Sequence, residues 1–200
     1  MAKVILKALN VLSRNKGLIQ VWREGKMRKR EAAQVVRYIL RKLEGSVEGR
    51  KKLQKLVYFV DSIHDIKELS FFMGIYGPYS RELDDLVMVE GDSYGISSKL
   101  EERGDYVVTI ISLAREDKEK EVHLPERLKG AVDEVIDKLG DLSASELELY
   151  SSVHYVATTT GERDPSEIWE ILRMLKPSKG YSKEDVKRAL EFLEKTGFLG

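Results

Sequence analysis

Along most of the chain, apolar residues recur every three or four positions, which is the spacing that forms one face of an α-helix. The stretches that show this spacing are residues 2–13, 27–43, about 46–63, 80–89, 125–139, 143–159, 164–176 and 182–196. Residues 94–100 and 106–113 flank the polar stretch 101–105 instead, which is the pattern of a β-hairpin. Residues 69–75 are aromatic and suit a strand, and residues 18–22 suit either a strand or a linker.

Several of these stretches begin with a residue that can act as a helix N-cap by accepting a hydrogen bond from the first turn. The expected N-caps are Ser46, Ser80, Ser143, Asp164 and Ser182. Ser143 is followed three residues later by Glu146, which makes a capping box, and Asp164 is followed by Pro165. The helix starts are therefore expected at these positions.

The predicted fold class is mainly α with a small β-hairpin, an α+β fold. Two helices followed by a hairpin are the order that a winged-helix domain needs, so residues 24–114 are expected to form a winged-helix-like lobe. This lobe would pack on a helical lobe of residues 122–200. Residues 1–23 would supply an N-terminal helix and a linker, and the charged stretch 115–121 would form a solvated boundary between the lobes.

The composition narrows the class of protein. Hydrophobic residues make up 42% of the chain, enough for a core, and the absence of cysteine excludes disulfides and thiolate metal sites. No apolar run reaches the roughly 18 residues that span a membrane, and the start of the chain turns polar too soon for a signal peptide. A cytoplasmic protein without a membrane partner is expected. Few amides and 34% charged residues are typical of thermophile proteins.

The charge is divided between the two ends of the chain. Residues 1–58 carry 16 lysines and arginines against four acidic residues, and residues 59–200 carry 18 against 30, so a net charge of zero hides +12 and −12. One interpretation is that the basic part binds nucleic acid or an acidic partner. The other is that the two parts complement each other within one fold. The basic residues that could contact a partner are Arg28, Lys29, Arg30, Arg50, Lys51, Lys52 and Lys55.

Two segments carry a resemblance to known proteins. The first is Lys-Leu-Gln-Lys-Leu-Val-Tyr-Phe at residues 52–59, and the second is Tyr-Gly-Pro-Tyr-Ser-Arg-Glu-Leu at residues 76–83. Together they resemble the signature of the SocA-like antitoxin domain, also called Panacea, and of YwgA-type proteins. The resemblance implies a helical fold with a hairpin and a role as an antitoxin or as an adaptor that delivers a toxin to a protease. Tyr76 and Tyr79 would then line a partner groove, or alternatively pack within the fold around a turn at Gly77-Pro78.

Motifs of known catalytic chemistry are absent from the sequence. It contains no Walker loop, dinucleotide-binding glycine fingerprint or serine elbow. The histidines His64, His123 and His154 are scattered, and Glu146 and His154 would lie about 12 Å apart along one helix, too far to share a metal. No enzyme activity, cofactor or metal is expected. The leading hypothesis is a non-catalytic module that recognises a protein partner; the alternative is a DNA-binding winged-helix regulator that uses the basic helices of residues 24–55.

Overall fold

The computed structural model describes residues 2–13, 29–64, 69–118 and 121–200. Its α-helices are α1 (Ala2–Ser13), α2 (Lys29–Lys42), α3 (Arg50–His64), α4 (Arg81–Met88), α5 (Glu126–Leu139), α6 (Ala144–Thr160), α7 (Pro165–Leu175) and α8 (Lys183–Lys195). Its strands are β1 (Ser46–Glu48), β2 (Phe72–Gly74), β3 (Gly77–Tyr79), β4 (Ile96–Arg103) and β5 (Tyr106–Leu113). The described residues also contain the 3₁₀ turns η3 (Gly91–Tyr94), η4 (Arg115–Asp117) and η5 (Pro177–Lys179). The predicted α+β class is confirmed. None of the helices within the described ranges has both the length and the apolar character needed to cross a bilayer.

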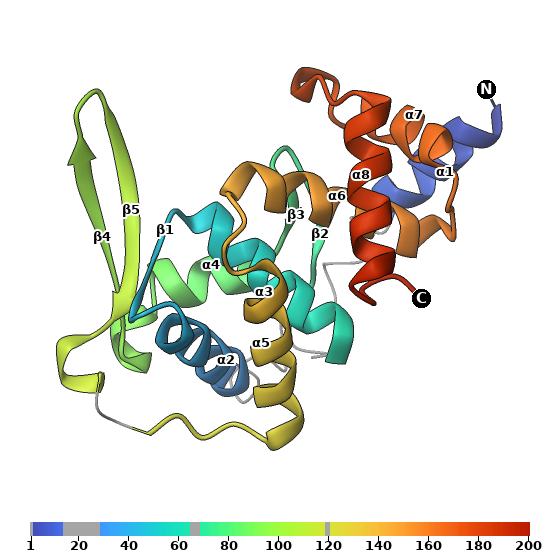
Figure 1. Cartoon of the computed structure of the whole chain (residues 1–200). Coiled ribbons are helices and arrows are strands. Elements are labelled where there is room, and N and C mark those ends of the chain that lie inside the picture. The colour runs from blue at the N-terminus through green and yellow to red at the C-terminus, as the bar shows by residue number, and fades with distance from the viewer. Residues whose placement is uncertain (1, 14–28, 65–68, 119–120) are drawn as a thin grey trace.

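The strands form two small antiparallel sheets. One has the order β1-β5-β4 and the other pairs β2 with β3. The β4–β5 hairpin, which the sequence predicts, extends away from the helices (Figure 1). From α2 to β5 the elements follow the order helix, strand, helix, two-stranded pair β2–β3, helix and hairpin. The winged-helix-like lobe expected for residues 24–114 stays a prediction.

Strand β1 replaces the beginning of a predicted helix. Ser46 does not cap α3; it lies in β1, and α3 begins at Arg50. Val47 of β1 is buried opposite Ile111 of β5, and the Gly49 amide donates to the Thr109 carbonyl at 2.8 Å. Pairing with a strand more than 60 residues later has therefore overridden the local N-cap signal.

The other predicted N-caps are confirmed. The Ser80 side chain accepts a hydrogen bond from the Leu83 amide, and Ser143 forms its capping box with Glu146. Asp164 accepts hydrogen bonds from the first turn of α7, and Ser182 forms a second capping box, with Asp185, at the start of α8. Each of these signals depends only on neighbouring residues, because the donor and the acceptor lie within one turn.

The core is organised around α3. The predicted apolar face of this helix is buried, as are the expected partners on α4; the residues are Leu53, Leu56, Val57, Val60, Leu83, Leu86 and Val87, with Ile63 half-buried beside them. Helices α5 and α6 pack against α3, and α5 also packs against α2 (Figure 1). The buried residues of 24–114 and of 122–200 belong to one hydrophobic cluster, so the two predicted lobes share a core.

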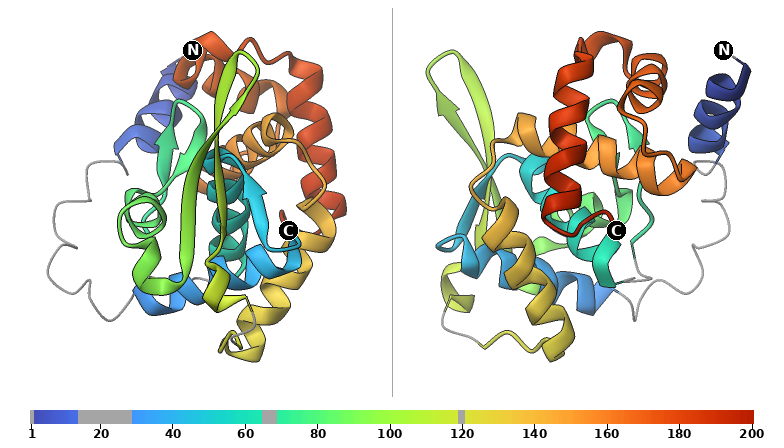
Figure 2. Two further views of the ribbon diagram at one scale, coloured as in Figure 1. Left: turned by 90° about the vertical axis from the view of Figure 1, so that its left-hand side faces the viewer. Right: turned by 45° about the vertical axis from the view of Figure 1, so that its right-hand side comes forward.

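The N-terminal helix packs against the C-terminal part of the chain. Helix α1, predicted over residues 2–13, packs against α6 and α7 near the other end of the chain, as Figure 2 shows. Its inward residues Ala8 and Val11 are buried there. The predicted strand or linker at residues 18–22 lies outside the described residues.

A core truncation tests this arrangement. Leu56 is fully buried on α3, so Leu56→Ala is expected to lower the free energy of unfolding by about 2–5 kcal/mol through lost burial and a residual cavity. Chemical denaturation monitored by circular dichroism measures the change. A loss below about 1 kcal/mol would contradict a central position for this face of α3.

Candidate functional site

The two motif segments of the sequence meet in space. The Lys55 ammonium on α3 donates to the Pro78 carbonyl at 2.6 Å. The side-chain amide of Gln54 donates to the Ser80 carbonyl at 2.9 Å, and its oxygen accepts from the Ser80 amide at 3.0 Å. Three hydrogen bonds from consecutive residues of α3 thus fasten the segment that contains β3, and they fix where the β2–β3 turn lies.

The β2–β3 turn also presses closely on α6. Gly77 has a φ of +85°, and a Cβ atom there would lie 2.9 Å from the Ser152 Oγ atom and 3.2 Å from the Lys55 Cε atom. Both its backbone conformation and the lack of space require glycine. The Tyr-Gly-Pro-Tyr-Ser segment is therefore built for a close approach to α6.

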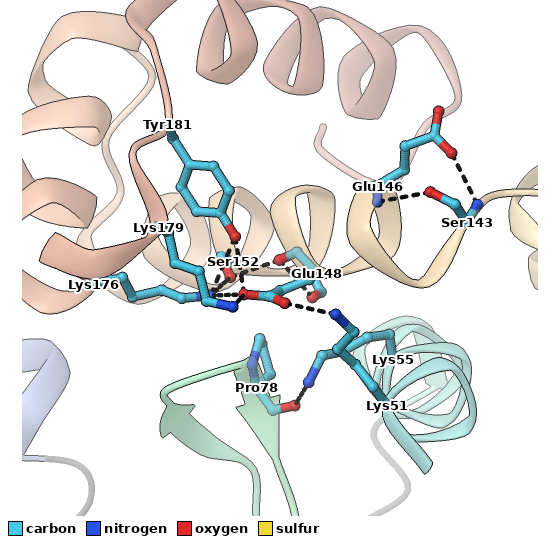
Figure 3. Close-up of polar contacts among 11 residues, drawn as sticks. Lys51, Lys55, Pro78, Ser143, Glu146, Glu148, Ser152, Lys176, Lys179 and Tyr181 are labelled. Atoms are coloured by element: carbon cyan, nitrogen blue, oxygen red, sulfur yellow. Dashed lines mark hydrogen bonds and ion pairs between the residues drawn. The ribbon is translucent and has the colours of Figure 1, made fainter. Parts of the chain in front are cut away.

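The carboxylate of Glu148, on α6, is the centre of this region (Figure 3). Its Oε1 atom accepts from the Lys176 ammonium at 2.9 Å and from the Tyr181 hydroxyl at 3.0 Å, and lies 2.8 Å from the Lys179 ammonium. Its Oε2 atom accepts from the Lys51 ammonium at 3.0 Å. The glutamate is only 3% exposed, so these groups replace its hydration. Together with Lys55 and Ser152 they form what we call the Glu148 cluster.

The electrostatics of the cluster follow from burial and from the excess of lysines. Burial, together with the nearby Lys176 ammonium, lowers the pKa of Lys55 to about 7. Burial also lowers the pKa of Lys176 to about 8, although Glu148 opposes that change. Burial acts to raise the pKa of Glu148, but the hydrogen bonds from Lys179 and Lys176 outweigh it and bring the pKa to about 2. The carboxylate is thus ionised at neutral pH, and one negative charge faces four lysines.

The exposed side of the cluster carries an aromatic ring. Tyr76 is 59% exposed and Ile75 is 72% exposed, both at the β2–β3 turn. The Lys179 ammonium lies 4.3 Å from the centroid of the Tyr76 ring, and the Lys51 ammonium lies 5.7 Å from it. Both distances are within the range of cation–π attraction. Ile75, Tyr76, Lys51 and Lys179 form what we call the Tyr76 surface, in which apolar contact area and positive charge lie side by side.

Of the residues singled out in the sequence, Lys51, Lys55 and Tyr76 come together at this site. Lys55 is buried, so it is not on the surface with the other basic residues of α3. Tyr79 is half-buried; its ring packs edge-on against Phe72, and burial together with Asp84 raises its pKa. Tyr79 thus follows the packing alternative, whereas Tyr76 is exposed.

Of the other basic residues singled out in the sequence, Arg30, Arg50 and Lys52 lie outside the Glu148 cluster. Arg28 lies outside the described residues, Lys29 is the first residue of α2, and Arg30 is exposed on the same helix. Arg50 is exposed and pairs with Asp84 at 3.5 Å, and Lys52 is half-buried on α3.

The charge asymmetry of the sequence is partly satisfied inside the fold. Within the described ranges, basic residues from the first 58 form ion pairs with acidic residues from later in the chain. The pairs are Lys7–Glu162, Arg37–Asp117, Lys42–Asp133, Arg50–Asp84 and Lys51–Glu148. The interpretation in which the two parts of the chain complement each other is thereby supported for these residues.

Sequence reasoning missed most of the Glu148 cluster. Glu148, Ser152, Lys176, Lys179 and Tyr181 were not expected to act together. The signal in the sequence is weak, because α6 mixes polar and apolar residues, and of its two glutamates Glu146 is exposed whereas Glu148 is buried. A buried carboxylate needs partners. The sequence does not indicate which lysines those partners are.

A second buried polar group lies further along α6. The Nδ1 atom of His154 lies 2.7 Å from the Tyr58 hydroxyl, and its Nε2 atom lies 3.0 Å from the Phe198 carbonyl. Burial lowers the pKa of His154 to about 4, so the ring is neutral at pH 7, with Nε2–H donating to the carbonyl and Nδ1 accepting from the hydroxyl. In the described parts of the chain, no three His, Asp or Glu residues lie close enough to hold a metal.

Comparison with known proteins yields one distant relative. The chain is 28% identical over 155 residues to the protein YwgA of Bacillus subtilis (strain 168), which is described as uncharacterized. The matched region covers 75% of this chain and 87% of YwgA. No protein-family model matches the chain. These results support distant homology to YwgA, and they assign no activity.

Removing the charge of Glu148 tests the cluster. Glu148→Gln is expected to destabilise the protein by about 3–5 kcal/mol, because the fully buried Lys176 ammonium loses its charged partner. The matched control is Glu146→Gln, an exposed position on the same helix where glutamine still supports the capping box, with an expected change within about 0.5 kcal/mol. Equal losses of unfolding free energy in the two variants would contradict the central role of Glu148.

Acidification tests His154. Because the folded pKa of about 4 lies below the unfolded value of 6.5, the unfolded chain binds the proton first as pH falls, and stability is lost progressively between those values. The expected loss from this group is about 2 kcal/mol between pH 7 and pH 5. Denaturation of the protein and of His154→Gln at both pH values measures it. A variant that loses as much stability as the original protein would contradict this assignment.

Proposed function

We propose that this protein is a non-catalytic binding module of the SocA/YwgA type, antitoxin- or adaptor-like, that recognises a protein partner through the Tyr76 surface. The observation that carries the proposal is the exposure of Ile75 and Tyr76 on a turn that is itself immobilised. Lys55 and Gln54 fasten the segment after this turn to α3, and Gly77 presses it against α6. Distant homology to YwgA is consistent with the proposal but assigns no partner.

The chemistry of the Tyr76 surface favours an acidic segment of a protein. Tyrosine is enriched at the centres of protein interfaces, where its ring supplies contact area at a low entropic cost. A rigid turn reduces the entropy lost on binding. The ammonium groups of Lys51 and Lys179 are partly exposed, and they share a single carboxylate with the buried Lys176. A partner carboxylate beside an apolar side chain would complement both the charge and the ring.

The state of the ionisable groups supports binding over catalysis. Lys55 has a lowered pKa, which is a property of reactive lysines, but its ammonium is buried and bonded to the Pro78 carbonyl. Lys176 is likewise buried against Glu148 and Ser152. Both ammonium groups therefore support the β2–β3 turn. To act in catalysis they would have to contact a substrate, and their buried hydrogen bonds oppose that.

The DNA-binding alternative has less support. That alternative uses the basic helices of residues 24–55. If the second of them, α3, formed a helix-turn-helix with α4, then α4 would be the helix placed in the major groove. That helix carries Glu82, Asp84 and Asp85 against one arginine, Arg81. The β4–β5 hairpin, which would act as the wing, carries three acidic residues (Glu101, Glu102, Asp105) against two basic ones. Carboxylates at both positions would repel phosphates.

A substitution at the turn tests the proposed function. The double variant Ile75→Ser with Tyr76→Ser is expected to lose binding, because it removes the apolar contact area and leaves the Glu148 cluster intact. The original protein and the variant serve as immobilised bait for an extract of the source cells. Proteins that the original protein captures and the variant does not are then purified, and their binding to each is measured by calorimetric titration. The dissociation constant is expected to rise at least about 100-fold in the variant.

The control is Tyr106→Ser, an equally exposed tyrosine on the β4–β5 hairpin. It should retain every partner that the original protein captures. The proposal fails if the double variant captures and binds the same proteins with the same affinity. Salt-dependent binding of a labelled duplex that resists the double substitution would instead favour the DNA-binding alternative.

A further inference from the structure

Strand β4 lies at an open edge of its sheet. The strand order β1-β5-β4 leaves its outer side without a neighbouring strand in the described parts of the chain. The hairpin extends away from the helices in Figure 1 and in the right-hand view of Figure 2. Leu100, near the middle of β4, is 73% exposed, and Tyr106 and Val107 on β5 are also exposed. An open edge with apolar side chains is a template for pairing with another strand.

The backbone groups at this edge can be identified. The Ala114 amide donates to the Gly95 carbonyl at 2.9 Å, so these opposite residues form a hydrogen-bonded pair. Hydrogen-bonded and non-hydrogen-bonded pairs alternate along an antiparallel ladder. The observed register therefore directs the backbone groups of Ser97, Lys99 and Glu101 toward β5, and those of Ser98, Leu100 and Glu102 outward.

We propose that β4 pairs antiparallel with β4 of a second copy of this chain, with the two-fold axis at Leu100. Leu100 then lies opposite Leu100 of the second copy, where the outward backbone groups of both can bond. Lys99 lies opposite Glu101 of the second copy, and Glu101 lies opposite its Lys99. Both copies thus contribute the same residues to the interface, as two-fold symmetry requires, and two pairs of opposite charges form across it.

The charges favour this register over those shifted by two residues. Sliding the copies by two residues in one direction places Lys99 opposite Lys99 of the second copy, and sliding them in the other places Glu101 opposite Glu101 of the second copy. Like charges directly opposite each other are destabilising. Sliding by one residue sets outward backbone groups against inward ones, which removes the hydrogen bonds. The interface lies on a different element from the Tyr76 surface and does not depend on the proposed function.

A charge exchange tests the proposal. Sedimentation equilibrium of the full chain is expected to show a monomer–dimer equilibrium. Lys99→Glu alone, or Glu101→Lys alone, should raise the dimer dissociation constant at least about tenfold, because each sets like charges opposite one another twice. The double variant Lys99→Glu with Glu101→Lys should return the dissociation constant to that of the original protein. Lys187→Glu, an exposed charge reversal on α8, is the control and should leave it unchanged.

A cross-link provides a second readout. The chain has no cysteine, so Leu100→Cys introduces a single thiol. Paired residues at the two-fold axis would have Cα atoms about 5.5 Å apart, within the range of a disulfide. Oxidised glutathione should therefore convert Leu100→Cys to a covalent dimer well before the control Val89→Cys, another exposed position. Thermal melting confirms that each variant is folded.

Three results would overturn the proposal. The first is a chain that remains monomeric at every concentration. The second is a dimer whose dissociation constant is the same in the single charge variants. The third is a double charge variant that dissociates as readily as the single ones, since only restoration shows that these two residues face each other.

Discussion

The burial of the Glu148 carboxylate is the constraint on which the surrounding structure depends. A carboxylate removed from water is costly unless charged donors surround it, and here they come from α3, from the turn η5 and from the residue just before it. Segments separated by more than 100 residues in sequence are thereby fixed to the same point of α6. The ammonium groups outnumber the carboxylate, so they repel one another. This repulsion adds to the effect of burial, and together they lower the pKa of Lys55 to about 7.

This arrangement determines the position of the exposed Tyr76 ring and of the ammonium groups beside it. The β2–β3 turn reaches α6 because Gly77 has no side chain, and it stays there because Lys55 holds the Pro78 carbonyl. Tyr76 precedes that glycine, so its ring is placed over the ammonium groups that face Glu148 from the outside. The Tyr-Gly-Pro-Tyr-Ser turn and the Glu148 cluster thus depend on each other: the buried contacts orient the exposed Tyr76 ring.

The features that the sequence predicts well are local. The N-caps Ser80, Ser143, Asp164 and Ser182 and the apolar face of α3 depend on neighbours within a turn or two, and all are confirmed. Ser46 was misassigned because its conformation depends on pairing with β5. The Glu148 cluster was missed for the same physical reason. Its members lie far apart in sequence, and neither periodicity nor capping indicates which lysine reaches which carboxylate.

The separation of charge along the chain takes a different meaning once the fold is known. As a linear pattern it left open both an external partner, nucleic acid or acidic protein, and pairing within the fold. In the structure several basic residues of the N-terminal part are paired with later carboxylates, including Arg37 with Asp117 and Lys42 with Asp133. Those residues have little charge left for phosphates. At the Glu148 cluster, by contrast, four lysines face one carboxylate, so positive charge remains uncompensated beside Tyr76. The local imbalance, more than the overall asymmetry, indicates where an acidic partner would be attracted.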